Sequence, residues 1–199
     1  MKYIIMADGK GARWNNYNNV PKHLIEINGE TLLSRIVRLL KIYDSESQII
    51  ITSHDERYEV EGATRYEPQN NVLELDRFTR ELIEDEICFL YGDTYYSQEA
   101  IQQIINGETE DVLFFGNLQS IVAVKIKKAE VFVRHLNNVR TLFEAGKING
   151  CKGWQVYQSF ADLPFDEKKI GKKYICINDE TEDFNSLEDY KKIMKEEVL

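Results

Sequence analysis

Two glycines, an arginine and a lysine follow an apolar run near the N-terminus, and these residue types suit the binding of phosphate. The run 4–6 reads Ile-Ile-Met, which is typical of a buried parallel strand. Gly9 and Gly11 follow it and let the backbone pass close to a ligand, so that consecutive N–H groups can point at phosphate oxygens. Arg13 adds a planar charge for paired hydrogen bonds, and Lys22 adds a mobile ammonium group. The spacing therefore predicts an anion-binding loop.

The same spacing is similar to the opening of a known family. Residues 6–13 read Met-Ala-Asp-Gly-Lys-Gly-Ala-Arg, and Pro-Lys follows at 21 and 22. This resembles the nucleotidyltransferases that make nucleotide-activated sugars, alditols and choline, in which the first strand runs into L-A-x-G-x-G-x-R and later P-K. The resemblance implies a nucleotide-binding loop beside two catalytic cations: Ala7, Asp8, Gly9 and Gly11, with Arg13 and Lys22.

Asp8 departs from the family pattern, which usually has Ala or Gly at this position. A carboxylate beside a triphosphate repels it unless a metal ion, Lys10 or a donor on the nucleobase takes up the charge. Asp8 therefore either accepts a hydrogen bond from the exocyclic amine of cytosine or helps to hold Mg²⁺, or it marks a decayed site. A glycine-rich turn after a strand is also often only a turn.

Two aspartates are predicted to hold a metal ion. Ligands of parallel α/β sheets bind at the carboxyl ends of the strands, and Asp93 follows the apolar run 89–91 and a glycine. It resembles the family's Gly-Asp pair, whose Asp holds Mg²⁺. Asp183 lies in a run, 182–190, that resembles the family's late D-x-[NDT]-x-x-[ED]-[DEL] segment. Two carboxylates with substrate phosphates and water suffice for Mg²⁺.

Each aspartate also has a plain structural interpretation. An Asp after a strand is commonly a loop residue or a helix cap. Asp179, Glu180 and Glu182 crowd around Asp183, so that any of them could replace it or all could form a solvated loop.

Asn70 and Asn71 are predicted to read the nucleobase. The pair resembles the cytidylyltransferases that activate choline phosphate or polyol phosphates more than the sugar type, and an amide can both donate to and accept from a pyrimidine edge. A turn before a helix is the alternative interpretation.

Apolar periodicity predicts the elements that position these residues. Strands are expected at 48–52, 63–66, 87–91, 112–115, 121–126 and 172–177, and helices at 31–41, 72–84, 98–106, 128–145 and 186–197. Ser97 is expected to cap one helix, and Ser186 with Asp189 has capping-box spacing. Most of the aromatic run 154–160 is expected in the core, with an acceptor pocket as the alternative.

The alternation predicts one domain over residues 1–199, with a three-layer, Rossmann-like α/β fold and a mostly parallel sheet. The resemblance implies that the fold is of the nucleotide-diphospho-sugar transferase type.

Composition narrows the class of protein. The 199 residues carry a net charge of −9, which disfavours a general nucleic-acid binder. Cys88, Cys151 and Cys176 are widely spaced, so neither a disulfide framework nor a zinc site is indicated, and Cys88 and Cys176 are expected in the core. The sequence has no apolar stretch of about 18 residues and begins with a strand. A cytoplasmic protein without membrane insertion is expected.

The resemblance implies an enzyme that transfers a nucleotidyl group with Mg²⁺. An NTP, with CTP favoured, reacts with a small phosphorylated sugar, polyol or amino alcohol, releasing pyrophosphate and forming an activated precursor for surface polysaccharide or a related glycoconjugate. A glycosyltransferase using an NDP-sugar is one alternative, although residues 93–95 read Asp-Thr-Tyr and lack the usual D-x-D. A catalytically silent nucleotide-binding module is another, and formation of a homo-oligomer stays open.

Overall fold

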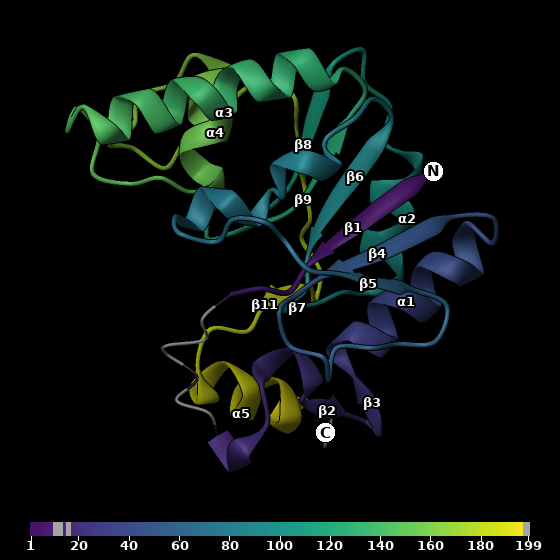
Figure 1. The fold of residues 1–199 in the computed structure, drawn as a ribbon. Coiled ribbons are helices and arrows are strands. Elements are labelled where there is room, and N and C mark those ends of the chain that lie inside the picture. The colour runs from purple at the N-terminus through teal and green to yellow at the C-terminus, as the bar shows by residue number, and fades with distance from the viewer. Residues whose placement is uncertain (10–13, 15–16, 197–199) are drawn as a thin grey trace.

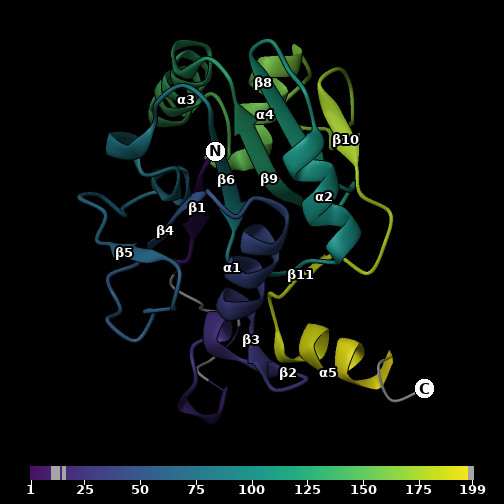
Figure 2. The ribbon, with the colours of Figure 1, turned by 90° about the vertical axis from the view of Figure 1, so that its right-hand side faces the viewer.

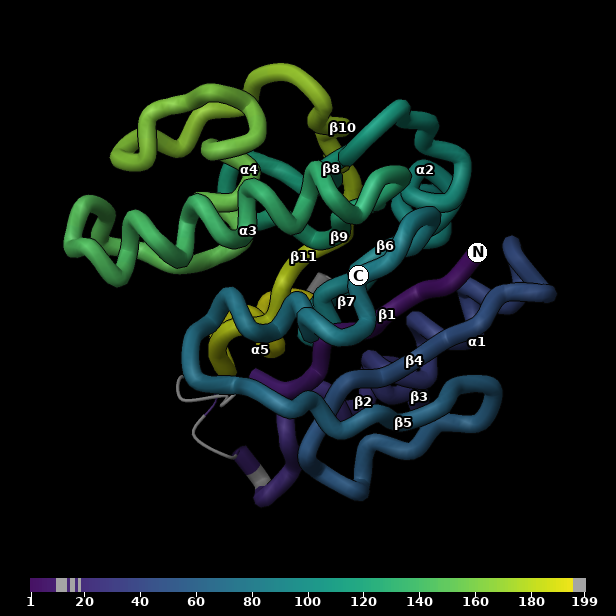
Figure 3. The backbone as a smooth tube through the Cα atoms, turned by 45° about the horizontal axis from the view of Figure 1, so that its top comes forward, coloured from purple at the N-terminus to yellow at the C-terminus, as the bar shows by residue number. Residues whose placement is uncertain are grey.

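The computed structural model describes residues 1–9, 14 and 17–196. A seven-stranded sheet forms the centre of the molecule (Figure 1). Its strands, in spatial order, are β10 (Tyr174–Cys176), β8 (Val112–Gly116), β9 (Ile121–Ile126), β6 (Ile87–Tyr91), β1 (Lys2–Met6), β4 (Gln48–Thr52) and β5 (Thr64–Tyr66). β9 is antiparallel to both neighbours, and the other pairs are parallel. Figure 3 traces the sheet from the β10 edge to the β5 edge.

Helices cover both faces of this sheet. α1 (Leu32–Tyr43) and α2 (Gln98–Asn106) pack on one face, and α3 (Ala129–Glu144) and α4 (Gly153–Ala161) on the other (Figure 2). Side chains alternate along β1, because Tyr3 and Ile5 belong to the first core cluster and Ile4 and Met6 to the second. The predicted three-layer α/β fold with a mostly parallel sheet is confirmed.

Side chains cap the helices where the sequence predicted it. The Ser97 hydroxyl accepts a hydrogen bond of 2.8 Å from the N–H of Ala100 at the start of α2. Before α5 (Leu187–Glu196), the Asp189 carboxylate accepts from the N–H of Ser186 at 2.7 Å, and the Asp189 N–H donates to the Ser186 hydroxyl at 3.3 Å. Both predicted caps are confirmed.

Two short ribbons extend the carboxyl edge of the sheet. β7 (Thr94–Tyr95) pairs antiparallel with β11 (Glu182–Asp183), and β2 (Glu26–Ile27) pairs with β3 (Glu30–Thr31). α5 lies beside the β2–β3 ribbon (Figures 1 and 2), and a third apolar cluster containing Trp14, Phe184 and Ile193 joins them. The returning C-terminal chain is thereby held against the end of β6.

Two predictions about local structure are wrong, and one helix was not predicted. Residues 72–84 form two short 3₁₀ turns, η3 (Glu74–Arg77) and η4 (Arg80–Leu82), instead of one helix. The Asp76 carboxylate accepts from the N–H groups of Val72 and Leu73, which closes the first turn locally. Residues 153–161 form the helix α4, which was not predicted. Cys176 is exposed because it lies on the edge strand β10, whereas Cys88 is buried as expected.

Among the described helices, none is both long and apolar enough to cross a membrane.

Candidate functional site

A buried ion pair between Lys22 and Asp93 marks the centre of the candidate site. Both residues are 7% exposed, and the Lys22 ammonium donates a hydrogen bond to the Asp93 carboxylate. The same ammonium lies 3.4 Å from the carbonyl oxygen of Phe184. Burial raises the pKa of Asp93, but the charges of Lys22 and Arg77 outweigh it and shift this pKa downward. Asp93 is therefore ionised at neutral pH.

Gly92 explains how Asp93 reaches this position. The Gly92 N–H donates to the carbonyl of Met6 at 2.9 Å, which draws the end of β6 onto the end of β1. A Cβ at Gly92 would lie 2.9 Å from that carbonyl oxygen, so a larger residue would push the strands apart.

The structure brings Asp183 next to Asp93 although 90 residues separate them. Asp183 pairs with Thr94 in the β7–β11 ribbon, and the Phe184 N–H donates to the Asp93 carbonyl at 2.6 Å. The Asp183 carboxylate accepts from the Ser120 hydroxyl at 2.9 Å and from the Asn185 amide.

Its acidic neighbours are engaged elsewhere. Glu182 accepts a hydrogen bond of 2.7 Å from Lys192, and Asp179 accepts from the Ser97 hydroxyl at 2.7 Å and from the Thr181 N–H at 2.8 Å. Asp183, and neither of these, lines the cavity beside Asp93.

Two cavities meet at Lys22. The larger, of about 760 Å³, contains Asp93 and Asp183, and the smaller, of about 460 Å³, is lined by the loop that follows β1. Lys22 contributes to the walls of both. Lys22 is therefore the residue through which the two cavities share a wall.

Ala7, Asp8 and Gly9, the residues predicted to bind the nucleotide, line the smaller cavity. The other two members of the predicted phosphate site, Gly11 and Arg13, lie outside the described residues.

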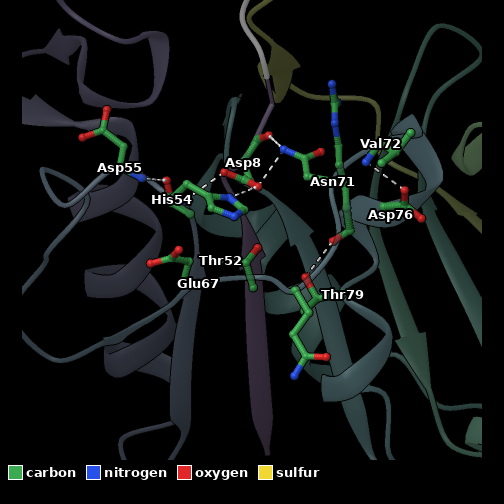
Figure 4. Close-up of polar contacts among 12 residues, drawn as sticks. Asp8, Thr52, His54, Asp55, Glu67, Asn71, Val72, Asp76 and Thr79 are labelled. Carbon is green, nitrogen blue, oxygen red and sulfur yellow. Dashed lines mark hydrogen bonds and ion pairs between the residues drawn. The ribbon is translucent and has the colours of Figure 1, made fainter.

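Asp8 is fully engaged by groups of the protein itself (Figure 4). Its carboxylate accepts from the His54 N–H at 2.9 Å and contacts the His54 Nδ1 at 2.7 Å. Asn71 donates from its side-chain amide to the Asp8 carboxylate at 2.7 Å and to the Asp8 carbonyl at 2.8 Å. The Asp8 carboxylate, which was expected to repel phosphate, thus links the chain segments after β1, β4 and β5 by hydrogen bonds.

The structure separates the two predicted base-reading amides. Asn71 reaches the loop through Asp8, but Asn70 is exposed and lines a different cavity of about 260 Å³ with Arg80 and Arg140. Asn70 is therefore not brought together with the other candidate site residues.

A buried histidine, His23, holds the segment that carries Lys22 by a hydrogen bond. His23 is 2% exposed, and its Nδ1 shares a hydrogen bond of 3.0 Å with the Tyr58 hydroxyl. Burial lowers the pKa of His23 to about 3, so the ring is neutral at physiological pH. The pair fixes η2 (Lys22–Leu24) from which the Lys22 side chain extends.

Sequence reasoning missed Arg77. Its guanidinium packs on Gly9, so closely that a Cβ there would lie 3.2 Å from an Arg77 nitrogen, and it lines the larger cavity with Lys22 and Asp93. Arg77 belongs to no recognised motif. The helix that was expected over 72–84 also gave no reason to place its side chain at the site.

The far wall of the larger cavity comes from α4 and the segment after it. Trp154 lies there with one face on Tyr174, at 6.1 Å between ring centroids, and with the Lys168 ammonium 5.4 Å from its ring centroid. The other aromatic residues of this run, Tyr157 and Phe160, are buried in the core, as expected.

Asp93 and Asp183, the two predicted metal ligands, line the same cavity. Within the described part of the chain, no three His, Cys, Asp or Glu side chains form a metal-binding group. Two carboxylates at one cavity are the protein share that Mg²⁺ takes when substrate phosphates and water complete its shell.

Several solved structures have the same fold as this chain. The nucleoside-diphosphate-sugar pyrophosphorylase of Vibrio cholerae superposes with a TM-score of 0.66 at 10% identity, over 98% of this chain and 100% of the other. The 4-diphosphocytidyl-2C-methyl-D-erythritol synthase of Anaerococcus prevotii gives 0.63 at 13% identity, over 100% and 96%. The CTP:phosphocholine cytidylyltransferase of Streptococcus pneumoniae gives 0.59 at 15% identity, over 98% and 97%.

No family model and no curated protein sequence matches the chain. The structural matches share the mostly parallel α/β fold of this chain, in agreement with the expected fold class.

Proposed function

We propose that residues 1–199 form one nucleotidyltransferase domain, which transfers a nucleotidyl group from an NTP to a small phosphorylated substrate and releases pyrophosphate. The observation that carries this proposal is the position of Lys22, which pairs with Asp93 and lines both cavities where they meet. A reaction between two substrates needs such a junction.

The smaller cavity is assigned to the nucleotide and the larger to the acceptor. Ala7 and Gly9 offer close backbone approach in the smaller cavity, whose volume of about 460 Å³ suits a small ligand. The larger cavity of about 760 Å³ offers the amides of Gln119 and Gln155, which suit the hydroxyl groups of a sugar or polyol phosphate.

The chemistry needs no protein nucleophile. An oxygen of the acceptor phosphate attacks the α-phosphorus, and the bond to the pyrophosphate oxygen breaks with its electron pair leaving on pyrophosphate. Lys22 stabilises the negative charge that builds up on the phosphoryl oxygens, because this residue lines both cavities. His23 and Tyr58 hold the segment that carries Lys22.

Asp93 and Asp183 are proposed to hold Mg²⁺. When bound, the ion would neutralise phosphate charge and polarise the reacting phosphoryl group. Ser120 and Asn185 orient the Asp183 carboxylate for this role by hydrogen bonds.

CTP is the first choice of nucleotide, and a polyol or sugar phosphate is the first choice of acceptor. Two similar structures are named for cytidylyl chemistry, which supports the base. The product would be an activated precursor for surface polysaccharide or a related glycoconjugate, made in the cytoplasm where NTPs are supplied.

A screen for pyrophosphate release tests the proposal. The four NTPs are each paired with phosphorylated sugars, polyols and amino alcohols in the presence of Mg²⁺, with the Asp93→Asn variant as the matched control. Release that requires both an NTP and one acceptor, and that is lost in the variant, supports the proposal. Absence of release with every pair, from protein shown to be folded, contradicts it.

A further inference from the structure

Arg77 occupies a position that the proposed reaction leaves without a role. It ends η3 (Glu74–Arg77), and its guanidinium rests on Gly9 while forming part of the cavity that contains Asp93. Its side chain is 25% exposed, so it is held in place yet open to a ligand. Arg77 thus touches the proposed nucleotide loop from the acceptor side.

In the described part of the chain, the other cationic side chains that line the two cavities have closer hydrogen-bond or ion-pair partners. Lys22 is paired with Asp93, and Arg57 makes hydrogen bonds of 2.5 to 3.1 Å to Asp55. Lys152 approaches Glu74 to 3.4 Å, and Lys168 donates to the Gln119 carbonyl at 2.8 Å.

Within the described part of the chain, the ion pair of Arg77 is with Glu74. It spans 3.9 Å, which is beyond hydrogen-bond distance. Guanidinium groups bind phosphate through two parallel hydrogen bonds, and Arg77 keeps donors available for this. Its guanidinium also lies beside Gly9, the residue that follows Asp8, so its positive charge opposes the repulsion of an anion by the Asp8 carboxylate.

We infer that Arg77 binds a substrate phosphate group in the larger cavity, on the side where its guanidinium lies against Gly9 of the smaller cavity. The inference rests on the proposed function, because that function places phosphates there. The phosphate belongs either to the nucleotide or to the acceptor, and separate titrations distinguish these sources.

The test uses calorimetric titration of the wild type, Arg77→Gln and Arg77→Lys. Inorganic tripolyphosphate probes the nucleotide's phosphates, and inorganic phosphate added to CTP-saturated protein probes the acceptor's. Arg77→Gln is expected to weaken at least one of these affinities by about tenfold or more, because it removes charge-assisted hydrogen bonds to the phosphate. Arg77→Lys should fall between the two.

Arg80→Gln is the matched control. Arg80 lies three residues further on, is exposed, and contacts Asn137 at 3.5 Å beside a separate cavity. Its substitution should leave both affinities within twofold of the wild type.

Cytidine serves as a ligand without phosphate. Equal cytidine affinity in Arg77→Gln and wild type shows that the loss concerns phosphate and not folding, whereas equal losses for cytidine and tripolyphosphate overturn the inference. Unchanged tripolyphosphate and phosphate affinities in Arg77→Gln, with CTP bound normally by the wild type, overturn it while leaving the proposed function intact. A wild type that neither binds nor turns over any NTP overturns the proposed function as well.

Discussion

Lys22 has two separable duties, in the ion pair with Asp93 and in the proposed reaction. We expect Lys22→Ala to lower kcat/KM by about 10² or more, the size found when one charge that stabilises a transition state is removed. It should also lower the free energy of unfolding by about 3 kcal/mol, because Asp93 is left buried without its partner. Steady-state kinetics and urea unfolding measure the two effects.

Lys127→Ala is the control for this substitution, since Lys127 is exposed and forms only a surface ion pair with Glu86 at 3.6 Å. An effect of Lys22→Ala on kcat/KM below about threefold would remove Lys22 from the chemistry.

The two aspartates give a second prediction at the level of single residues. Asp93→Asn and Asp183→Asn should each abolish turnover and weaken Mn²⁺ binding, followed by electron paramagnetic resonance, because each removes a charged oxygen ligand. Glu182→Gln is the matched control, as Glu182 is adjacent to Asp183 but bonded to Lys192. Wild-type turnover and Mn²⁺ affinity in either aspartate variant would exclude that residue as a ligand.

Part of the candidate site could be predicted from single residues and part could not. Lys22, Asp93 and Asp183 follow recognisable spacings, and the structure brings them together at one edge of the sheet. Asn70 followed the same kind of spacing and lies at another cavity. Arg77 shows the converse, because its place on Gly9 depends on a turn whose geometry comes from tertiary contacts.

At the scale of elements, the Asp8 contacts join three segments into one frame. Asp8→Ala removes hydrogen bonds to His54 and Asn71, so we expect a loss of about 1–3 kcal/mol in the free energy of unfolding and weaker binding of every NTP. The alternative is that the Asp8 carboxylate accepts a hydrogen bond from the exocyclic amine of cytosine, in which case Asp8→Ala would affect CTP binding most.

Chemical unfolding and nucleotide titration of Asp8→Ala and Asn71→Ala distinguish these outcomes. In the frame account both variants weaken CTP and UTP binding alike, and the double variant loses less stability than the sum of the single losses. Loss of discrimination between CTP and UTP in Asp8→Ala alone, with unchanged stability, would contradict the frame account.

The elements that sequence patterns predicted poorly are those shaped by single tertiary contacts. In residues 72–84 the apolar spacing favours a helix, but Asp76 bonds back to Val72 and Leu73 and pairs with Arg140 of α3. α4 was not predicted because it begins with a glycine, Gly153. A glycine is needed there because the Tyr91 hydroxyl would lie 2.4 Å from an added Cβ. Strands of the sheet centre were predicted well, since they are continuous apolar runs.

At the scale of the whole molecule, His23 makes stability depend on pH. The pKa of His23 is about 3 in the folded protein and about 6.5 when unfolded. Between these values the unfolded chain binds a proton that the folded protein does not, so this contribution to stability is complete above about pH 6.5 and is lost as the pH falls toward 3. At pH 5 the loss is about 2 kcal/mol.

Urea unfolding at pH 7 and pH 5 measures this dependence. His23→Gln should lose about 2 kcal/mol less than the wild type over that interval, because the group that takes up the proton on unfolding is absent. Equal losses in wild type and His23→Gln would show that His23 does not contribute.

The arrangement of the whole fold was predictable because alternating apolar segments leave few α/β topologies. The position of β9, antiparallel between β6 and β8, was not encoded in any pattern of its own residues. That pairing brings Ser120 and Ile121 to the cavity beside Asp183.

The most direct measurement of the central claim follows the α-phosphorus. With CTP labelled at that atom, Mg²⁺ and the acceptor found by the pyrophosphate screen, the wild type should move the label into a product that also contains the acceptor phosphate, while pyrophosphate stays unlabelled. Asp93→Asn should leave the label in CTP. Label appearing in free CMP at a rate independent of the acceptor would contradict nucleotidyl transfer.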